Sequence, residues 1–480
     1  MQKRYLILSF IEGAAVMAAE LCGAKLLAPV FGSSLYVWSA VMGVTLGALA
    51  TGYFYGGKLS LKKENLNSVL FKVLLLAAIF ILLMPLCESY LLNYLSSFPF
   101  TLAVVLSSFV ILFLPVFLLG ASSPLFIALQ TKTQNDSGQV SGTIYAISTF
   151  GGIIATFLCG FYLIPQWGLT ITLINFGSLL FIAALLLLKI FKVAYLFIFF
   201  GLFFLNLKHF YTAEDILYSS ESIMGKVEIK DVKRAEGNVR LLLVNKIVQS
   251  EMSLLTQKSV SDYIKLLDAV IINEKAPKRA LVLGLGAGLT SNLLVQKGYH
   301  VTAVEFDARI IEVAENYFEL NKKVRTVCDD ARHFINQSDE RYDLVLFDVF
   351  KSEELPDHVI TQESLAKLKH LLYPNAQVFV NWHGYLKGEI GKGTSVVYNT
   401  LKTSFSEVFL NSTSLVEDSR NIVFTAFNPQ SLYSNSYVDT NFVPFLFPTQ
   451  EINTDDRPVL QKANALAGKR WRALYLLASI

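Results

Sequence analysis

The first 210 residues consist of long apolar runs separated by short polar stretches. Six runs approach or exceed the ~20 residues that a helix needs to cross a bilayer. They lie at residues 5–27, 35–55, 69–91, 100–129, 140–164 and 170–188. A seventh run, 193–207, is shorter and rich in phenylalanine, so it fits either a seventh span or a helix in the membrane interface. The pattern predicts a multi-spanning α-helical transmembrane domain over residues 1–210.

After this domain the apolar runs become short. Segments 222–233 and 238–250 alternate apolar and polar residues around the turn-like RAEG, which predicts a small β-hairpin region over 211–256. Beyond it, short apolar strands such as 280–283 alternate with helical periodicity. This alternation predicts an α/β, Rossmann-like domain with a doubly wound sheet over 257–480.

Charge is distributed unevenly along the chain, which is 53% hydrophobic and 16% charged. Residues 1–210 carry 11 Lys and Arg against 5 Asp and Glu, a net of +6, so the rest must carry −3 within the total of +3. The second part therefore lacks the basic surface typical of nucleic-acid binding, and we expect no nucleic-acid partner. The four cysteines form no CxxC pair, which indicates neither a disulfide framework nor a metal site.

Lysine and arginine mark one side of the membrane domain. They precede the first run and follow the second, fourth and sixth, whereas the loops near Gly32, Asn93 and Gln166 contain none. Such residues are enriched in cytoplasmic loops, so we expect the N-terminus in the cytoplasm. Six spans would leave the second part inside and seven would place it outside; the sequence leaves both open. Glu20 and Lys25, within the first run, fit either a structural ion pair or a polar site.

A glycine-rich turn suggests a nucleoside ligand. The stretch LVLGLGAG places Gly284, Gly286 and Gly288 between a predicted strand and a predicted helix. Glycines let the backbone approach a ligand closely, and the start of a helix offers free N–H groups. Glu305 ends the next strand, where an acid can accept hydrogen bonds from ribose hydroxyls. The acidic CDDAR at 328–332 suits an adenine amino group, so the pattern favours an S-adenosyl cofactor over a dinucleotide.

Several segments of the second part resemble the spermidine synthase family, the polyamine aminopropyltransferases. They fall within about residues 222–427 and include ESIMGKVEI, LLLVNKIVQS, LVLGLGAG, VEFD, CDDARHFI and YDLVLFDVF. The whole chain is similar to the branch in which a multi-spanning membrane domain precedes such a unit, and TDDRPVL at 454–460 resembles the tail of that branch. The resemblance implies the class I methyltransferase fold and an S-adenosyl co-substrate without a metal.

The resemblance also implies contacts with the cofactor, beyond those of the glycine turn. Gln249 matches a glutamine that touches cofactor and product, and Glu305 matches the acid that binds the ribose. Asp329 and Asp330 match the turn beside the adenine. One of these two aspartates fits equally well as a cap for the following helix.

The candidate catalytic residue is Asp348, which ends the strand in YDLVLFDVF and matches the family's catalytic aspartate. An aspartate at this edge can orient an attacking amine and accept its proton. Tyr263 matches a tyrosine of the substrate pocket, although a tyrosine packed in a helix fits as well. His383, in NWHGY, and Asp455 and Asp456, in TDDRPVL, are further candidate substrate contacts, with a structural role as the alternative for each.

Three departures from the family pattern bear on the reaction. Ala287 stands where the family has an aspartate for the aminopropyl amine, Lys351 replaces a second acid, and Ile264 with Lys265 replaces an acid or histidine. The family favours aminopropyl transfer from decarboxylated S-adenosylmethionine to a small amine. The departures favour methyl transfer from S-adenosylmethionine to a membrane-associated acceptor. A membrane transporter or sensor with a nucleoside-binding domain is the third hypothesis.

The expected location follows from the cofactor. We expect an integral protein of the cell's inner membrane, embedded in the lipid bilayer, and a homodimer through the soluble domain is compatible with it. Because S-adenosyl compounds are made in the cytoplasm, the soluble domain is expected there. That location requires an even number of spans.

Overall fold

The computed structural model divides the chain into two compact units. Unit 1 comprises Met1–Asp215 and Ser219–Lys226, and unit 2 comprises Ile216–Tyr218 and Val227–Ile480. The structure describes residues 2–31, 35–61, 65–90, 95, 98, 100–188, 193–211, 216–222, 224–235, 237–271, 278–349, 357–414, 420–428 and 449–478.

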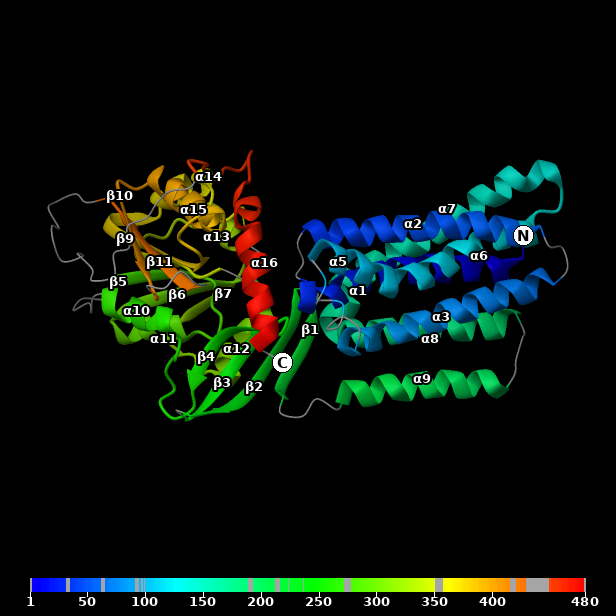
Figure 1. The fold of residues 1–480 in the computed structure, drawn as a ribbon, viewed down its shortest axis with the longest axis horizontal. Coiled ribbons are helices and arrows are strands. Elements are labelled where there is room, and N and C mark those ends of the chain that lie inside the picture. The colour runs from blue at the N-terminus through cyan, green and yellow to red at the C-terminus, as the bar shows by residue number, and fades with distance from the viewer. Residues whose placement is uncertain are drawn as a thin grey trace. The chain divides into compact units, whose positions relative to one another are not determined.

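Unit 1 is a bundle of long apolar helices (Figure 1). They are α1 (Lys3–Phe31), α2 (Leu35–Ser60), α3 (Leu66–Tyr90), α5 (Phe100–Ser108), η1 (Phe109–Phe113), α6 (Leu114–Gln130), η2 (Gln134–Asp136), α7 (Ser137–Leu158), η3 (Cys159–Leu163), α8 (Ile164–Leu188) and α9 (Val193–Tyr211). Among the described residues, five helical segments are long and apolar enough to cross a membrane. The last, Gln134–Leu186, extends over two of the predicted runs. Gly168, with a φ of 79°, makes a kink between these two runs. The predicted runs are thus helical.

The fourth predicted run is one continuous helix that contains a π-helical turn. The π-helical turn η1 separates α5 from α6 and ends two residues before Pro115. Proline has no N–H to donate to the preceding turn, so the hydrogen-bonding pattern must change there.

Glycines allow close contact between pairs of these helices. A Cβ added at Gly13 of α1 would lie 1.9 Å from the carbonyl oxygen of Ser148 in α7, and one at Gly151 of α7 would lie 2.1 Å from that of Phe10. Such contacts are typical of membrane helices, which pack through small residues. Glu12, which the apolar pattern hides, is 2% exposed beside them and accepts a hydrogen bond from the Ser148 hydroxyl at 2.9 Å.

The charged residues noted in the first run do not pair with each other. Glu20 and Lys25 are both described, and no ion pair joins them; the Lys25 ammonium lies 5.9 Å from the centre of the Trp38 ring. The expected structural ion pair is therefore absent between these two described residues.

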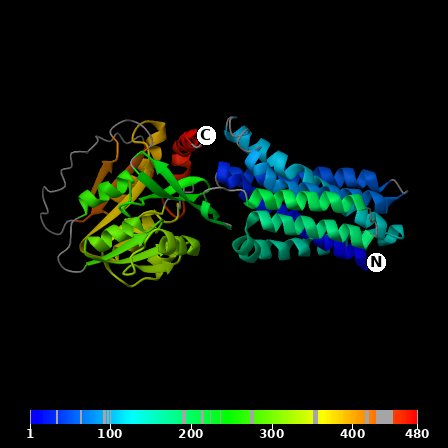
Figure 2. The ribbon, with the colours of Figure 1, turned by 90° about the horizontal axis from the view of Figure 1, so that it is seen from below.

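Helix α9 runs alongside α3, and Figure 2 shows it from below next to α8. The ring of Tyr195 lies 5.3 Å from that of Phe71, and Asn206 donates to the carbonyl of Leu82 at 2.9 Å. Both contacts join residues 124 positions apart, so α9 is parallel to α3 and in constant register with it. A helix lying flat in the interface would cross the others instead.

Unit 2 begins with a four-stranded sheet in the order β1-β2-β3-β4. Its strands are β1 (Ile216–Ser222), β2 (Gly225–Arg234), β3 (Gly237–Val244) and β4 (Ile247–Ser253), of which β1 and β2 are each divided between the two units. Asn245 and Lys246, with φ of 51° and 65°, make a tight turn between β3 and β4 that matches the twist of a hairpin. The predicted hairpin is the centre of this sheet.

A seven-stranded sheet in the order β10-β11-β9-β8-β5-β6-β7 forms the core of unit 2. The elements are α10 (Asp262–Val270), β5 (Lys278–Leu283), α11 (Leu289–Gln296), β6 (Tyr299–Glu305), α12 (Ala308–Tyr317), β7 (Arg325–Cys328), α13 (Ala331–Gln337), β8 (Tyr342–Phe347), α14 (Gln362–Lys369), β9 (Leu372–Gly384), η4 (Glu389–Gly391), α15 (Lys392–Lys402), β10 (Glu407–Ser412), β11 (Arg420–Phe427) and α16 (Leu460–Ala478). Strands β5 to β9 are parallel, and β11 is antiparallel to both β9 and β10. This is the predicted methyltransferase-like, Rossmann-like α/β fold.

Candidate functional site

The candidate site lies at the carboxyl ends of the neighbouring parallel strands β5, β6, β8 and β9. The chain continues from β5 to β6 on one side and returns to β8 on the other, so the strand order reverses between β5 and β8. Ligands of open α/β sheets bind in the crevice at such a reversal. Glu305 ends β6 and Asp348 directly follows β8, so both predicted acids are at this edge.

The glycine turn after β5 requires glycine for two separate reasons. Gly284, Gly286 and Gly288 have φ of 90°, 54° and 73°, a region that other residues rarely adopt. A Cβ at Gly284 would also lie 2.2 Å from the carbonyl oxygen of Asp348, so the turn packs directly on the backbone of that aspartate. The hydroxyl of Ser250 on β4 accepts a hydrogen bond from the Ala287 N–H at 3.2 Å. The turn and the hairpin sheet are thereby joined.

Glu305 is buried beneath this turn and holds it in shape. One carboxylate oxygen accepts from the Leu285 N–H at 3.0 Å, and the other accepts from the Asp307 N–H, also at 3.0 Å. A carboxylate has about four lone-pair positions, so two acceptor positions are left for other donors. The predicted ribose contact is compatible with this arrangement.

The two aspartates after β7 have different partners. Asp330 caps α13 by accepting from the His333 N–H at 3.0 Å, and it also contacts the ring of His358 at 3.1 Å. Burial alone would raise the pKa of Asp330, but these hydrogen bonds outweigh it and lower that pKa. Asp329 contacts the His333 ring at 2.9 Å, which raises the pKa of His333. Asp330 is thus the helix cap, whereas Asp329 contacts the side chain of His333 on the same helix.

Asp348 is held by side chains from two other elements. Its two carboxylate oxygens accept from the Asn381 amide at 2.8 Å and from the Tyr263 hydroxyl at 3.2 Å. Asn381 accepts in turn from the Asn421 amide at 3.0 Å. Burial raises the pKa of Asp348, and the hydrogen bonds from Asn381 and Tyr263 oppose that rise. The arrangement fits an acid that accepts a proton at the end of a strand.

A cleft of about 1070 Å³ opens beside Asp348. It brings together four of the predicted residues, namely Gln249, Tyr263, Asp348 and His383. Burial lowers the pKa of His383 to about 4, and its ring lies 4.8 Å from that of Trp471. His383 is therefore neutral at physiological pH. The glycine turn, Glu305 and the aspartates after β7 are outside the lining of this cleft.

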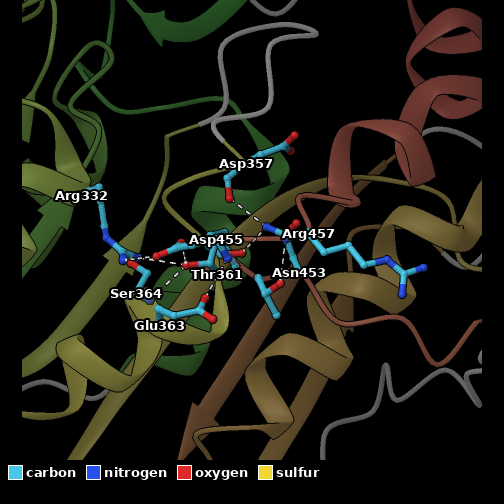
Figure 3. A network of polar contacts seen from close by, with 10 residues as sticks. Arg332, Asp357, Thr361, Glu363, Ser364, Asn453, Asp455 and Arg457 are labelled. Carbon is cyan, nitrogen blue, oxygen red and sulfur yellow. Dashed lines mark hydrogen bonds and ion pairs between the residues drawn. The ribbon is translucent and has the colours of Figure 1, made fainter.

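The structure assigns Asp455 to a polar network, shown in Figure 3, in place of the predicted substrate contact. Asp455 accepts from Arg332 at 2.8 Å and from the Thr361 hydroxyl at 2.7 Å, and its own N–H donates to Glu363 at 2.9 Å. Neither it nor the exposed Asp456 lines the cleft. The network ties the segment before α16 to α13 and α14, which gives Asp455 a structural role.

The positions that depart from the family pattern are occupied by apolar or paired side chains. Ala287 is 1% exposed and belongs to an apolar cluster with Leu289, Ile310 and Phe318. Ile264 belongs to the same cluster. The Lys265 ammonium pairs with Asp262 at 2.9 Å, and Lys351 lies outside the described residues. No described residue at these positions offers a carboxylate to a cationic substrate.

Sequence reasoning missed Ser250, Asn381 and Asn421. A weak signal existed for the two asparagines, since each is a polar residue within an otherwise apolar strand segment, VFVNW and NIVF. Their roles depend on which strands are neighbours, and this is not visible in the local pattern.

Part of the chain is similar to known proteins. A family model described as "Methyltransferase domain" matches residues 280–375. The chain is 28% identical over 154 residues to a polyamine aminopropyltransferase of Vibrio vulnificus, covering 31% of this chain and 48% of that protein. It is 32% identical over 114 residues to an N-terminal histidine N-methyltransferase of Emericella nidulans, covering 23% of this chain and 20% of that protein.

Among solved structures, the chain is similar to a probable spermidine synthase from Corynebacterium glutamicum. It has a TM-score of 0.39 and 19% identity, over 46% of this chain and 82% of that one. The chain spans about half or less of the length of the curated relatives it matches. The match at 280–375 identifies a methyltransferase-type domain within unit 2, and this part of the chain is similar both to polyamine aminopropyltransferases and to methyltransferases.

Proposed function

We propose that this chain is a membrane-anchored transferase that uses an S-adenosyl co-substrate. The glycine turn and Glu305 bind the nucleoside, and Asp348 receives the proton of the acceptor. The observation that carries the proposal is the carboxylate of Asp348, which lines the cleft and is held there by Asn381 and Tyr263.

The chemistry needs positioning and a proton acceptor. A nucleophilic atom of the acceptor attacks the carbon bound to the sulfonium, and the carbon–sulfur bond breaks with its electron pair going to sulfur. The donor becomes a neutral thioether, and the proton released by the acceptor passes to Asp348. Holding the two reactants in line supplies much of the rate enhancement in such a displacement.

Two donors are compatible with the site. Aminopropyl transfer from decarboxylated S-adenosylmethionine to a small amine is supported by relatives named polyamine aminopropyltransferase. Methyl transfer from S-adenosylmethionine to a membrane-associated acceptor is supported by Ala287, which packs in an apolar cluster at the position where the family has an acid for an aminopropyl amine. A transporter or sensor would need no proton acceptor beside the nucleoside site.

Binding measurements on the purified full chain distinguish the donors. Isothermal titration would compare S-adenosylmethionine, its decarboxylated form, S-adenosylhomocysteine and methylthioadenosine. Preference for the decarboxylated donor and methylthioadenosine supports aminopropyl transfer. Preference for S-adenosylmethionine and S-adenosylhomocysteine supports methyl transfer. If none of the four binds, the transferase proposal is wrong, and the transporter or sensor hypothesis takes its place.

A further inference from the structure

Two asparagines on neighbouring antiparallel strands form part of the wall of the cleft. In the β9–β11 pairing, Asn381 is opposite Val423 and Asn421 is opposite His383. The two asparagines are therefore diagonal neighbours two positions apart, and side chains two positions apart on a strand point to the same face. Asn381 is 6% exposed. A buried amide is costly unless its hydrogen bonds are made, so its partners are informative.

The hydrogen bonds of this pair run in one direction. The amide nitrogen of Asn421 donates to the side-chain oxygen of Asn381 at 3.0 Å, which turns the amide nitrogen of Asn381 toward Asp348 at 2.8 Å. Tyr263 donates to the other carboxylate oxygen. Asp348 is thus held by donors that are all neutral. Neutral donors stabilise the carboxylate and leave its negative charge uncompensated. A lysine or an arginine would instead neutralise that charge.

Other titratable groups around Asp348 come from every neighbouring element. They are Tyr263 on α10, Glu305 at the end of β6 and His383 on β9, while Arg420 at the start of β11 lines the same cleft. Burial raises the pKa of Tyr263 well above its usual value and lowers that of His383 to about 4. Both therefore stay neutral between pH 5 and pH 8, so neither changes its charge over the pH range of the test described below.

We propose that Asn381 is a positioning residue, which keeps Asp348 ionised and directed into the cleft. Asn421 orients Asn381. As a result, the site binds a sulfonium nucleoside in preference to the neutral thioether. This inference rests on the proposed function and adds a consequence to it. When the group is transferred, sulfur loses its positive charge and with it the attraction to Asp348. The attraction that holds the donor is then absent, so the neutral product is bound less tightly and leaves more readily.

A matched pair of ligands tests the inference without knowledge of the acceptor. Methylthioadenosine and its S-methylated sulfonium differ by one methyl group and one charge. Their affinities for the full chain would be measured by titration calorimetry from pH 5 to pH 8. We expect the sulfonium to bind more tightly at pH 8, with the preference declining as Asp348 is protonated at lower pH.

Variants of the two asparagines give the decisive comparison. In Asn381→Leu, the preference for the sulfonium at neutral pH should fall by about tenfold, the scale of one hydrogen bond to a charged group. When the pH is lowered, the remaining preference should begin to decline at a higher pH than in the wild-type chain. Asn421→Ala should change both in the same direction by less. Asn411→Leu is the control, because Asn411 is equally buried at 6% exposure on β10 of the same sheet but outside the cleft.

The outcomes separate this inference from the proposed function. If the wild-type chain binds neither probe, the nucleoside site and this inference both fail. If it binds both probes equally at every pH, or if Asn381→Leu keeps the wild-type preference and pH dependence, the positioning role is wrong while the nucleoside site stands. Should Asn381→Leu not fold, Asp348→Asn serves instead and should remove the preference at every pH.

Discussion

At the scale of single residues, Asp348 combines a functional position with a cost to stability. Because burial raises the pKa of Asp348 in the folded state above its ordinary value of 3.8, the folded chain binds the proton more tightly than the unfolded chain. The contribution of the Asp348 carboxyl to the free energy of unfolding is therefore fully present below pH ~3.8 and is lost as the pH rises through the pKa of the folded state. At neutral pH the charged form is the one that burial disfavours.

We predict that Asp348→Asn raises the melting temperature of the purified chain at pH 8, and that the gain vanishes below pH ~4, where the wild-type carboxyl is protonated in both states. Thermal unfolding followed by circular dichroism at several pH values measures this. Asp456→Asn, which removes an exposed carboxylate, is the control and should show no such trend. An Asp348→Asn chain less stable than wild type at pH 8 would contradict the prediction.

Glu305 should determine affinity for the nucleoside. Replacing Glu305 with Gln removes a charged acceptor from the ribose hydroxyls, so affinity for S-adenosyl ligands should fall at least tenfold, about 1.4 kcal/mol. Calorimetric titration at constant pH gives the value. Asp455→Asn is the comparison, because it breaks the ion pair with Arg332 away from the cleft and should lower stability while leaving affinity unchanged. Equal affinity in Glu305→Gln would remove Glu305 from the ribose site.

At the scale of elements, the α1–α7 contact depends on the absence of side chains at its crossing. A Cβ at Gly13 would overlap the carbonyl oxygen of Ser148, whereas Gly43 of α2 has open space around the same position. Alanine is favoured over glycine within a helix by about 1 kcal/mol, so the two sites should respond in opposite ways.

We predict that Gly13→Ala destabilises the chain in detergent by about 1–3 kcal/mol, the usual cost of overpacking, and that Gly43→Ala is neutral or stabilising. Fluorescence-monitored thermal unfolding of the two variants gives the comparison. Similar stabilities for both would show that the α1–α7 contact is looser than the structure has it.

At the scale of the whole molecule, the parallel packing of α9 on α3 determines where the soluble part begins. Gln2 bonds to Gln130 at the end of α6, and Tyr5 bonds to Asn67 near the start of α3, so these termini share one end of the bundle. Because α9 runs parallel to α3, it starts at this end and leaves at the opposite one. Its 19 residues are about 28 Å long, close to the ~30 Å hydrocarbon core.

This packing predicts that the soluble part and the N-terminus lie on opposite sides of the membrane. In a cysteine-free background, Leu61→Cys marks the N-terminal end and Gln337→Cys marks the soluble part. A membrane-impermeant thiol reagent applied to intact cells should label one and not the other. Lys58 and Lys132 lie at the N-terminal end of the bundle, whereas Lys62, Lys63, Lys189 and Lys192 fall outside the described residues. Lysines are enriched on the cytoplasmic side, so the N-terminal end is expected in the cytoplasm. The reagent should then label Gln337→Cys and not Leu61→Cys.

The labelling result also bears on the donor. A soluble part outside the cytoplasm would differ from the location expected for a cytoplasmic cofactor, and its S-adenosyl donor would have to be supplied on that side. Protection of both cysteines would instead show that α9 does not cross, restoring the even number of spans that a cytoplasmic soluble part needs.

Local patterns in the sequence were sufficient to predict the helices and strands and the polar or glycine residues at the ends of strands. Apolar runs of membrane-spanning length became helices, and the glycine turn and Glu305 were found because each follows directly from a strand. The length of α9 was underestimated, because the helix continues past the apolar run through Lys208 and His209 to Tyr211.

Partnerships between distant segments depended on the tertiary structure. Asn381 and Asn421 reach Asp348 only because β11 enters the sheet beside β9, and Asp455 is drawn to Arg332, 123 residues away, by the packing of the segment before α16. Periodicity reports which face of a strand is apolar, but not which strand lies beside it. The order of strands is set by how the whole sheet buries its apolar faces, and that order decided which polar side chains surround Asp348.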